Sequence, residues 1–103
     1  MKTVSVFDPA DPFDSILADM QKEMYSAISK HGFENTPLNP WKDPRDSFII
    51  LAEEFGEVAR ALTRDEGDIN NLIAELVQTA TMAAAMAVGV QSKRIYDSYG
   101  AQL

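Results

Sequence analysis

The sequence contains no cysteine among its 103 residues. Disulfide bonds, thiolate metal sites and cysteine nucleophiles are therefore excluded, and no covalent staple supports so short a chain. Long apolar runs are also lacking, because the most apolar window, residues 79–90, is too short and too rich in alanine to span a bilayer. The N-terminal residues have no apolar segment of the kind found in secretion signals. We expect a soluble, cytoplasmic protein with no membrane partner.

Basic residues are few, since nine Lys and Arg oppose sixteen Asp and Glu and give a formal net charge of −7. Acidic repulsion argues against a nucleic-acid polymer or an anionic membrane surface as the main partner. Apolar residues make up 46% of the chain and charged residues 24%, which is typical of a folded domain rather than a disordered tail. A domain of this size has a marginal core, so self-association would add to its stability.

Apolar residues at three- and four-residue spacing predict an all-α domain over residues 11–103, after an N-terminal arm of residues 1–10. The first helix covers about 12–30. Asp11 is its expected N-cap, because the carboxylate accepts hydrogen bonds from orphan N–H groups and Pro12 occupies a position that needs no N–H.

The remainder of the domain is predicted to hold a long loop, two further main helices and a short last one. The loop, residues 33–44, contains three prolines and the only tryptophan, and a loop this long in a small domain is often functional. The second helix starts at residue 43 or 46 and ends near 64, and the third begins after Asp68. Gly89 is the expected stop of the third helix, and residues 91–99 form the short fourth.

The third helix is rich in alanine near its C-terminal end. These alanines are Ala80, Ala83, Ala84, Ala85 and Ala87. They would let a partner backbone approach closely, and little else in a chain this short can cover such a surface. The sequence therefore predicts a four-helix bundle that a second protomer completes.

Three glutamates lie within five residues of the second helix, namely Glu53, Glu54 and Glu57. Like charges at this spacing cost helix stability, so another factor should compensate. The third helix carries a second polar pair, Glu75 and Gln78. Two antiparallel helices would bring these oxygen-bearing side chains together, which is how a hard cation such as Mg²⁺ or Mn²⁺ is held. The alternative is that the glutamates belong to solvated helix faces.

Other kinds of site fit the sequence poorly. It has no Gly-x-Ser-x-Gly elbow and no phosphate-binding glycine loop. The acidic turn near residues 65–68 is not a calcium loop, because Ile69 stands where glycine is required. Gly56, inside the second helix, costs about 1 kcal/mol relative to alanine and suggests close packing there.

The acidic pattern resembles the Glu-Glu-x-x-Glu … Glu-x-x-Asp signature of the MazG-like all-α nucleoside triphosphate pyrophosphohydrolases. Residues 51–62 are similar to the typical helix of that family, and residues 30–33 with Trp41 resemble the preceding segment, so the resemblance covers about residues 13–90. It implies cleavage of a (d)NTP to the (d)NMP and pyrophosphate, with Mg²⁺ or Mn²⁺ as cofactor, in nucleotide pool control or sanitation. It also implies dimers or dimers of dimers.

By position, the resemblance implies that Glu54, Glu57 and Glu75 are metal ligands. Glu53 would bind a further metal or orient the attacking water. Gln78 is the fourth implied ligand, but it departs from the family, which has aspartate there. An amide oxygen can coordinate Mg²⁺, yet it brings no negative charge, so a cation would be held less tightly.

Substrate binding is assigned to residues around the acidic helices. The candidates are Lys30, His31, Trp41, Asn71, Lys93, Arg94 and Tyr96. Trp41 could stack on a base or act as a lid over the core. The basic pair Lys93 and Arg94 could contact the β and γ phosphates or remain solvated surface. The competing function is a non-catalytic helical dimer, a regulatory or nucleotide-binding module that keeps the fold.

Overall fold

The chain folds into three α-helices and one short 3₁₀-helix in a computed structural model that describes residues 8, 10–64 and 68–102. The helices are α1 (Pro12–His31), η1 (Phe33–Asn35), α2 (Pro44–Thr63) and α3 (Ile69–Gln102). No strand occurs in the described ranges, so the predicted all-α class is confirmed. The predicted arm lies almost wholly outside the described residues, as does most of the acidic turn near residues 65–68.

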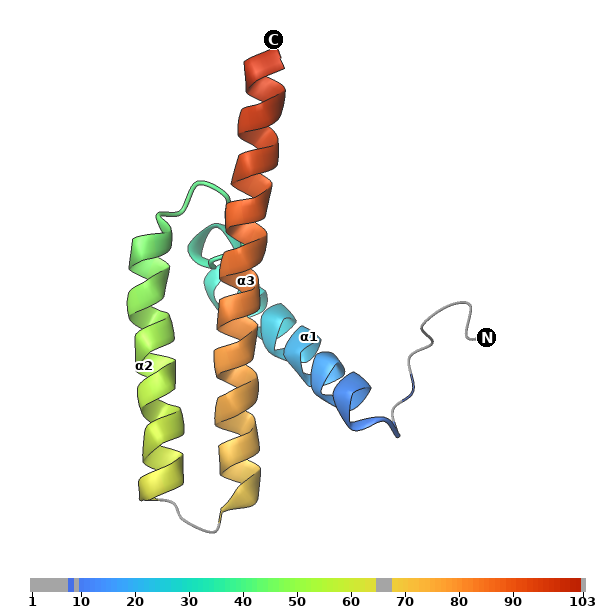
Figure 1. Ribbon diagram of the computed structural model, residues 1–103, viewed down its shortest axis with the longest axis vertical. Coiled ribbons are helices and arrows are strands. Elements are labelled where there is room, and N and C mark those ends of the chain that lie inside the picture. Colours follow the sequence, from blue (N-terminus) through green and yellow to red (C-terminus); the bar gives the residue numbers. More distant parts are fainter. Residues whose placement is uncertain (1–7, 9, 65–67, 103) are drawn as a thin grey trace.

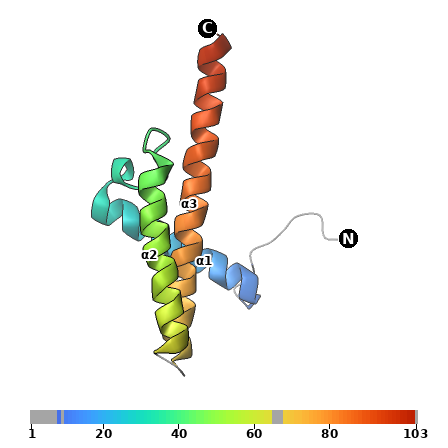
Figure 2. The same cartoon turned by 60° about the vertical axis from the view of Figure 1, so that its left-hand side comes forward.

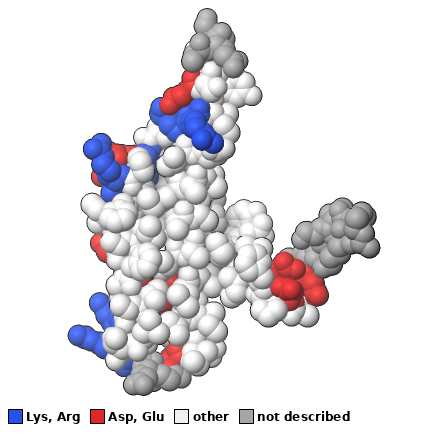
Figure 3. All heavy atoms as spheres, in the orientation of Figure 1, with Lys and Arg blue, Asp and Glu red and all other residues white. Residues whose placement is uncertain are grey.

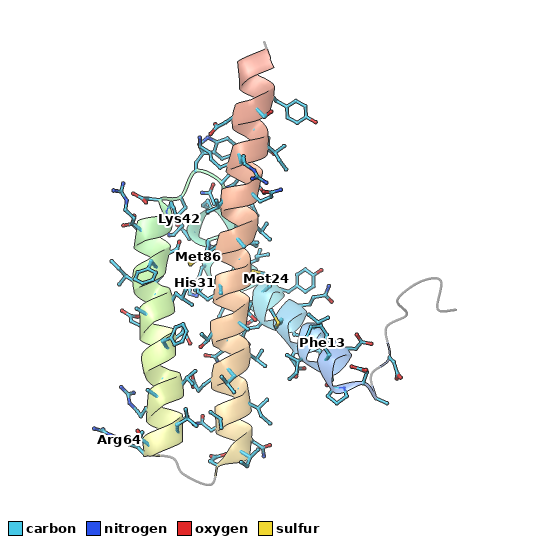
Figure 4. The ribbon with its side chains drawn as sticks, in the orientation of Figure 1. Phe13, Met24, His31, Lys42, Arg64 and Met86 are labelled. Carbon is cyan, nitrogen blue, oxygen red and sulfur yellow. The ribbon has the colours of Figure 1, made fainter. Side chains whose placement is uncertain are left out.

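Helices α2 and α3 form an antiparallel hairpin, and α1 crosses α3 at an angle (Figure 1). The view turned by 60° shows α1 passing on one side of the hairpin (Figure 2). The N-terminal end of α1 projects away from the hairpin, where Phe13 is exposed (Figure 4). The C-terminal part of α3 extends beyond the start of α2 (Figure 1).

Local sequence explains where α1 and α2 begin. The Asp11 carboxylate accepts hydrogen bonds from the backbone N–H groups of Phe13 (2.8 Å) and Asp14 (3.2 Å). Asp43 caps α2 in the same way, accepting from the N–H of Arg45 at 2.9 Å. Each cap is followed by a proline, whose missing N–H costs nothing at the first helical position.

The prediction that Gly89 ends the third helix is wrong, because α3 continues without a break to Gln102 and includes the expected fourth helix. One glycine costs a helix only about 1 kcal/mol, which the alanines at 83–85 and 87 can offset. Instead, the absence of a side chain at Gly89 lets the backbone of another segment approach α3 closely. A β-carbon at position 89 would overlap the carbonyl oxygen of Pro37 and lie 3.3 Å from its carbonyl carbon.

The core within one chain is small. Among the described residues, the buried apolar side chains are Ala61, Val77 and Ala85. Large apolar side chains remain exposed, and Phe55 retains 62% of its accessible surface. The close packing expected at Gly56 is not found, because among the described residues no atom outside its own helix lies within 4 Å of where its β-carbon would be.

Because α3 is uninterrupted, its residues Ile69–Gly100 are long and apolar enough to cross a membrane by length and composition alone. Core helices of soluble proteins pass the same test. Here the helix buries the hydroxyl-bearing Thr79 and Thr81, whose side chains donate to the carbonyl oxygens of Glu75 and Val77 at 2.8 and 2.7 Å. It also packs along α2, a helix with several charged residues. The share of this window that is buried within the described residues is 22%, so most of it is exposed in a single chain.

Candidate metal and nucleotide site

Glu54 of α2 and Glu75 of α3 belong to the rows of residues that lie between the two helices. Each of these side chains has its Oε2 atom buried, and neither atom has a hydrogen-bond partner among the described residues. Buried polar atoms in folded proteins are almost always paired, so two orphan carboxylate oxygens on facing helices call for a missing partner. Because α2 and α3 pack against each other, the two helices that carry the predicted acidic residues are neighbours in the fold.

Electrostatics make Glu54 the centre of this acidic group. Burial raises the pKa of Glu54 above its ordinary value, and the neighbouring carboxylates of Glu75, Glu57, Glu23 and Glu53 raise it further, in that order. Both effects disfavour the ionised form. A bound divalent cation would reverse this balance by supplying positive charge at the same place.

Glu23 of α1 is part of the group, and sequence reasoning missed it. It lines a cavity of about 100 Å³ together with Glu54, Gln78 and Met82. The available signal was its position on α1, where a half-buried acid interrupts the apolar row between Met20 and Met24. An acidic residue on the buried face of a helix costs free energy unless its charge is paired or binds a cation.

Glu57 and Glu53 are placed differently from Glu54. Glu57 forms an ion pair with Arg60, with distances of 2.9 and 3.1 Å from Nη1 to its two carboxylate oxygens, and Glu53 is exposed to solvent. Within the described ranges, no three His, Cys, Asp or Glu side chains are close enough together to hold a metal ion. An exposed ion pair of this kind contributes only about 0–1 kcal/mol, so Glu57 can leave Arg60 at little cost.

The aromatic and basic candidates form a second cluster, where the end of the loop that precedes α2 meets the C-terminal part of α3. The rings of Trp41 and Tyr96 pack with centroids 5.1 Å apart and planes tilted by 38°. Lys93 donates to the two carboxylate oxygens of Asp97 at 2.7 and 2.8 Å, and Arg94 donates to Gln91. The base-stacking candidate is thus engaged with a neighbouring side chain.

Lys42 and Lys93 line a cavity of about 150 Å³ beside this cluster, with Met86 and Val90 as part of its apolar wall. Gln78 and Lys93 are fifteen residues apart on one continuous helix, which corresponds to about 22 Å along its axis. A triphosphate chain is shorter than this distance. The structure therefore does not bring Lys93, Arg94 and Tyr96 to the carboxylates of the same chain.

Of the other substrate-binding candidates, Asn71 lies on the same helix as Glu75, and Lys30 and His31 lie on α1. Asn71 is half-buried in the first turn of α3, one turn before Glu75, and its N–H donates to Asp68 at 3.0 Å. Lys30 and His31 are exposed at the C-terminal end of α1, on the opposite end from Phe13 (Figure 4). Their roles in binding stay predictions.

Comparison with known proteins adds no assignment. No protein-family model, no curated protein and no solved structure matches the chain. What the protein does must be inferred from the residues that its helices bring together.

Proposed function

We propose that the chain is a metal-dependent nucleoside triphosphate pyrophosphohydrolase, which converts a (d)NTP to the (d)NMP and pyrophosphate in nucleotide pool control or sanitation. The observation that carries the proposal is the pair of buried carboxylate oxygens on Glu54 and Glu75, which have no hydrogen-bond partner among the described residues. The acidic signature on α2 and α3 supports it, since it resembles that of the MazG-like enzymes. We place this activity in the cytoplasm.

Mg²⁺ or Mn²⁺ is the proposed cofactor, because hard cations take carboxylate and amide oxygens as ligands. Glu54 and Glu75 would hold it through their buried oxygens, and Gln78, which lines a cavity together with Glu54, would add its amide oxygen. Glu57 would join after leaving Arg60. When bound, the ion neutralises phosphate charge and lowers the pKa of a coordinated water.

The remaining residues would act on substrate and water. Glu53, exposed next to Glu54, would orient the water that attacks the α-phosphorus. A nucleotide held at Glu54 and Glu75 does not reach Lys93, Arg94 or Tyr96 along α3. These residues and Trp41 would therefore contact substrate only across a subunit boundary.

Self-association as a dimer or a dimer of dimers, with a second protomer completing the helical bundle, is also part of the proposal. It is supported by the small number of buried apolar side chains and by the exposed aromatic residues Phe48, Phe55 and Tyr99 among the described residues. A chain of this size gains a sufficient core most easily from a second copy.

The test is to incubate the protein with each (d)NTP and Mg²⁺ or Mn²⁺ and to measure pyrophosphate and phosphate separately. We expect pyrophosphate from at least one nucleotide, with loss of activity in Glu54→Gln. Glu34→Gln, an exposed glutamate in η1, is the matched control and should keep full activity. Release of phosphate alone, or activity that survives Glu54→Gln, would rule out the proposed reaction.

A second candidate is a non-catalytic helical dimer that binds nucleotide for regulation. Two observations favour it. Gln78 stands where the resembled family has aspartate, and no three acidic side chains in the described ranges are close enough to hold a metal. This candidate predicts nucleotide binding, measured by calorimetry, without release of pyrophosphate or phosphate.

A further inference from the structure

The carboxylates of Glu54 and Glu75 lie far from the aromatic side chains that could stack on a base. Trp41 packs on Tyr96, which is twenty-one residues after Glu75 on the same continuous helix. This separation corresponds to about 32 Å along the helix axis. A nucleotide whose phosphates lie at the carboxylates of one chain therefore needs other side chains of that chain to hold its base.

A cavity of about 310 Å³ lies between α1 and α3, which diverge from their crossing toward their N-terminal ends (Figure 1). Glu23 and Gln78 line this cavity, and they also line the cavity of about 100 Å³ that contains Glu54. The two cavities therefore meet at these two side chains. We call the larger cavity the side compartment. A ligand in the side compartment lies next to the acidic group.

The side compartment has the size and the lining of a small-molecule pocket. Such pockets start at about 300 Å³ and combine apolar walls with a few polar groups. Ile73, Ala74 and Val77 of α3 form the apolar wall. Asn70 and Gln78 are eight residues apart on α3, so the compartment extends about 12 Å along that helix. This length accommodates a nucleoside whose phosphates point toward the acidic group.

The charges around the side compartment suit a neutral group better than a phosphate. Figure 3 shows basic side chains on the C-terminal part of α3 and acidic side chains at the N-terminal end of α1. Among the described residues that line the compartment, Lys22 is the only basic one, and it stands against Asp19 and Glu23. A triphosphate chain would be repelled there unless a cation accompanied it. The compartment is therefore a place for the base and not for the phosphates.

Asp19 and Lys22 offer a hydrogen-bond acceptor and a donor side by side. They are three residues apart on α1, which makes them neighbours on one face of the helix. Both line the side compartment, and neither takes part in an ion pair between described residues. The carboxylate accepts through two oxygens, whereas the ammonium group only donates. A base that fits this pair presents two neighbouring donors beside an acceptor.

We propose that the side compartment binds a guanine base, with Asp19 accepting from its N1–H and exocyclic amino group and Lys22 donating to its O6. Among the common bases, guanine alone presents two neighbouring donors and an acceptor on one edge. Adenine has an acceptor at N1, cytosine has an acceptor beside its amino group, and uracil and thymine have a single N–H between two carbonyls. The base site rests on the proposed function, because it takes a nucleotide whose phosphates lie at Glu54 and Glu75.

The experiment measures how tightly the wild-type protein binds nonhydrolysable triphosphates that carry a methylene group between the α and β phosphorus atoms, by calorimetry with Mg²⁺. The guanosine analogue should bind about tenfold or more tightly than the inosine analogue, which lacks only the exocyclic amino group. The adenosine, cytidine and uridine analogues should bind at least as weakly as the inosine analogue. Equal affinity for guanosine and inosine, or a preference for another base, would overturn the proposal. This comparison needs no variant, so it does not depend on how a substitution affects folding.

Two substitutions locate the base. Asp19→Asn should bring the affinities for guanosine and inosine to within about threefold of each other, because an amide cannot accept from both donors. Asp14→Asn, the same change elsewhere on α1, is the matched control and should keep the preference. Ala74→Leu fills the compartment and should weaken every analogue by about tenfold or more, whereas Ala52→Leu, at an exposed alanine on α2, should not. Equal effects in a variant and its control would contradict the location.

Binding and turnover together separate the base site from the proposed reaction. A preference for guanosine in binding, without release of pyrophosphate from any nucleotide, would uphold the base site and exclude the reaction. Release of pyrophosphate from all nucleotides with equal efficiency, without any preference in binding, would uphold the reaction and overturn the base site.

Discussion

The backbone carbonyl of Pro37 packs directly against Gly89, at a point where α3 has no side chain. The contact ties the proline-rich loop to the long helix, and the carbonyl oxygen of Asn39 is also within 3.4 Å of where a β-carbon would stand. Pro37 contributes to both the cavity that contains Glu54 and the cavity that contains Lys42. The loop is therefore held in place at the boundary between the two clusters of candidate site residues.

Gly89→Ala should destabilise the protein, because its β-carbon overlaps backbone atoms that cannot rotate away. Overpacking of this kind costs about 1–3 kcal/mol, which exceeds the gain of about 1 kcal/mol that alanine brings to a helix. Gly100→Ala is the matched control, since no atom outside its own helix lies near its β-carbon position, and it should be neutral or stabilising. The urea midpoint of each variant measures the difference. Equal midpoints for the two variants would contradict the close contact.

Glu54→Gln should raise the melting temperature of the metal-free protein by a few degrees. The change removes a buried charge from a group of like charges. The same variant should lose the stabilisation that Mn²⁺ gives the wild type, because it removes one of the two buried carboxylates. Thermal unfolding with and without Mn²⁺ measures both effects, and Glu34→Gln should behave as wild type does. A wild type that Mn²⁺ does not stabilise would count against a metal at Glu54.

Glu23→Gln should weaken Mn²⁺ binding without removing it, because Glu23 approaches the acidic group from α1 while Glu54 and Glu75 remain. Loss of a supporting group around a metal typically costs about 10- to 100-fold in affinity. Calorimetry with Mn²⁺ gives the dissociation constant. Asp14→Asn, at the far end of the same helix, controls for the general loss of negative charge. Unchanged affinity in Glu23→Gln would exclude Glu23 from the site.

Gln78→Asp should tighten the binding of Mn²⁺, because it adds a negative charge beside the cavity shared by Glu23 and Glu54. Without metal, the additional like charge should lower the melting temperature of the variant. Calorimetry and metal-free melting together separate the two effects. Weaker or equal Mn²⁺ affinity in this variant would contradict a metal between α2 and α3.

Asp43 should make stability depend on pH in the acidic range. Its hydrogen bonds with the Arg45 side chain lower the pKa of Asp43, and the hydrogen bond from the Arg45 backbone lowers it further. Because the pKa is lowered in the folded state, the ionised carboxylate stabilises the fold at pH values above the ordinary pKa of an aspartate. This contribution is lost as the pH falls through the lowered pKa. Asp43→Asn keeps an N-cap but cannot titrate. The difference in unfolding midpoint between wild type and Asp43→Asn should therefore shrink on acidification, and a constant difference would contradict the prediction.

Local signals predicted much of this fold. The Asp-Pro pairs at 11–12 and 43–44 are N-caps followed by proline. The predicted start of the first helix is confirmed, and of the two starts left open for the second helix, 43 or 46, the structure shows the first. Gly89 misled the prediction because a glycine that stops a helix and a glycine that admits a neighbouring backbone are identical in sequence. Only the position of Pro37, fifty-two residues earlier, distinguishes the two cases.

Part of the candidate site could also be predicted from local sequence signals. Spacing placed Glu54 and Glu75 on two neighbouring helices, and α2 and α3 do pack against each other, while the role of the two residues as ligands stays a prediction. Spacing could not show that Glu57 pairs with Arg60, since that depends on the choice of side-chain rotamer, nor that α1 adds Glu23, since that depends on how α1 crosses α3. The separation of Lys93 from the carboxylates follows from the unbroken helix, which the sequence did not reveal.

Because α3 is unbroken, a movement at the end of the helix that carries Glu75 is transmitted to the end that carries Tyr96. Glu75 and Tyr96 belong to one stiff rod and are separated by about six helical turns. A rotation of that rod that moves Glu75 relative to Glu54 also moves Tyr96 across the ring of Trp41, which it touches. Trp41 is the only tryptophan of the chain. We therefore expect the fluorescence of Trp41 to change when a ligand at Glu75 rotates the helix, and an unchanged spectrum would show that the helix does not turn as one body.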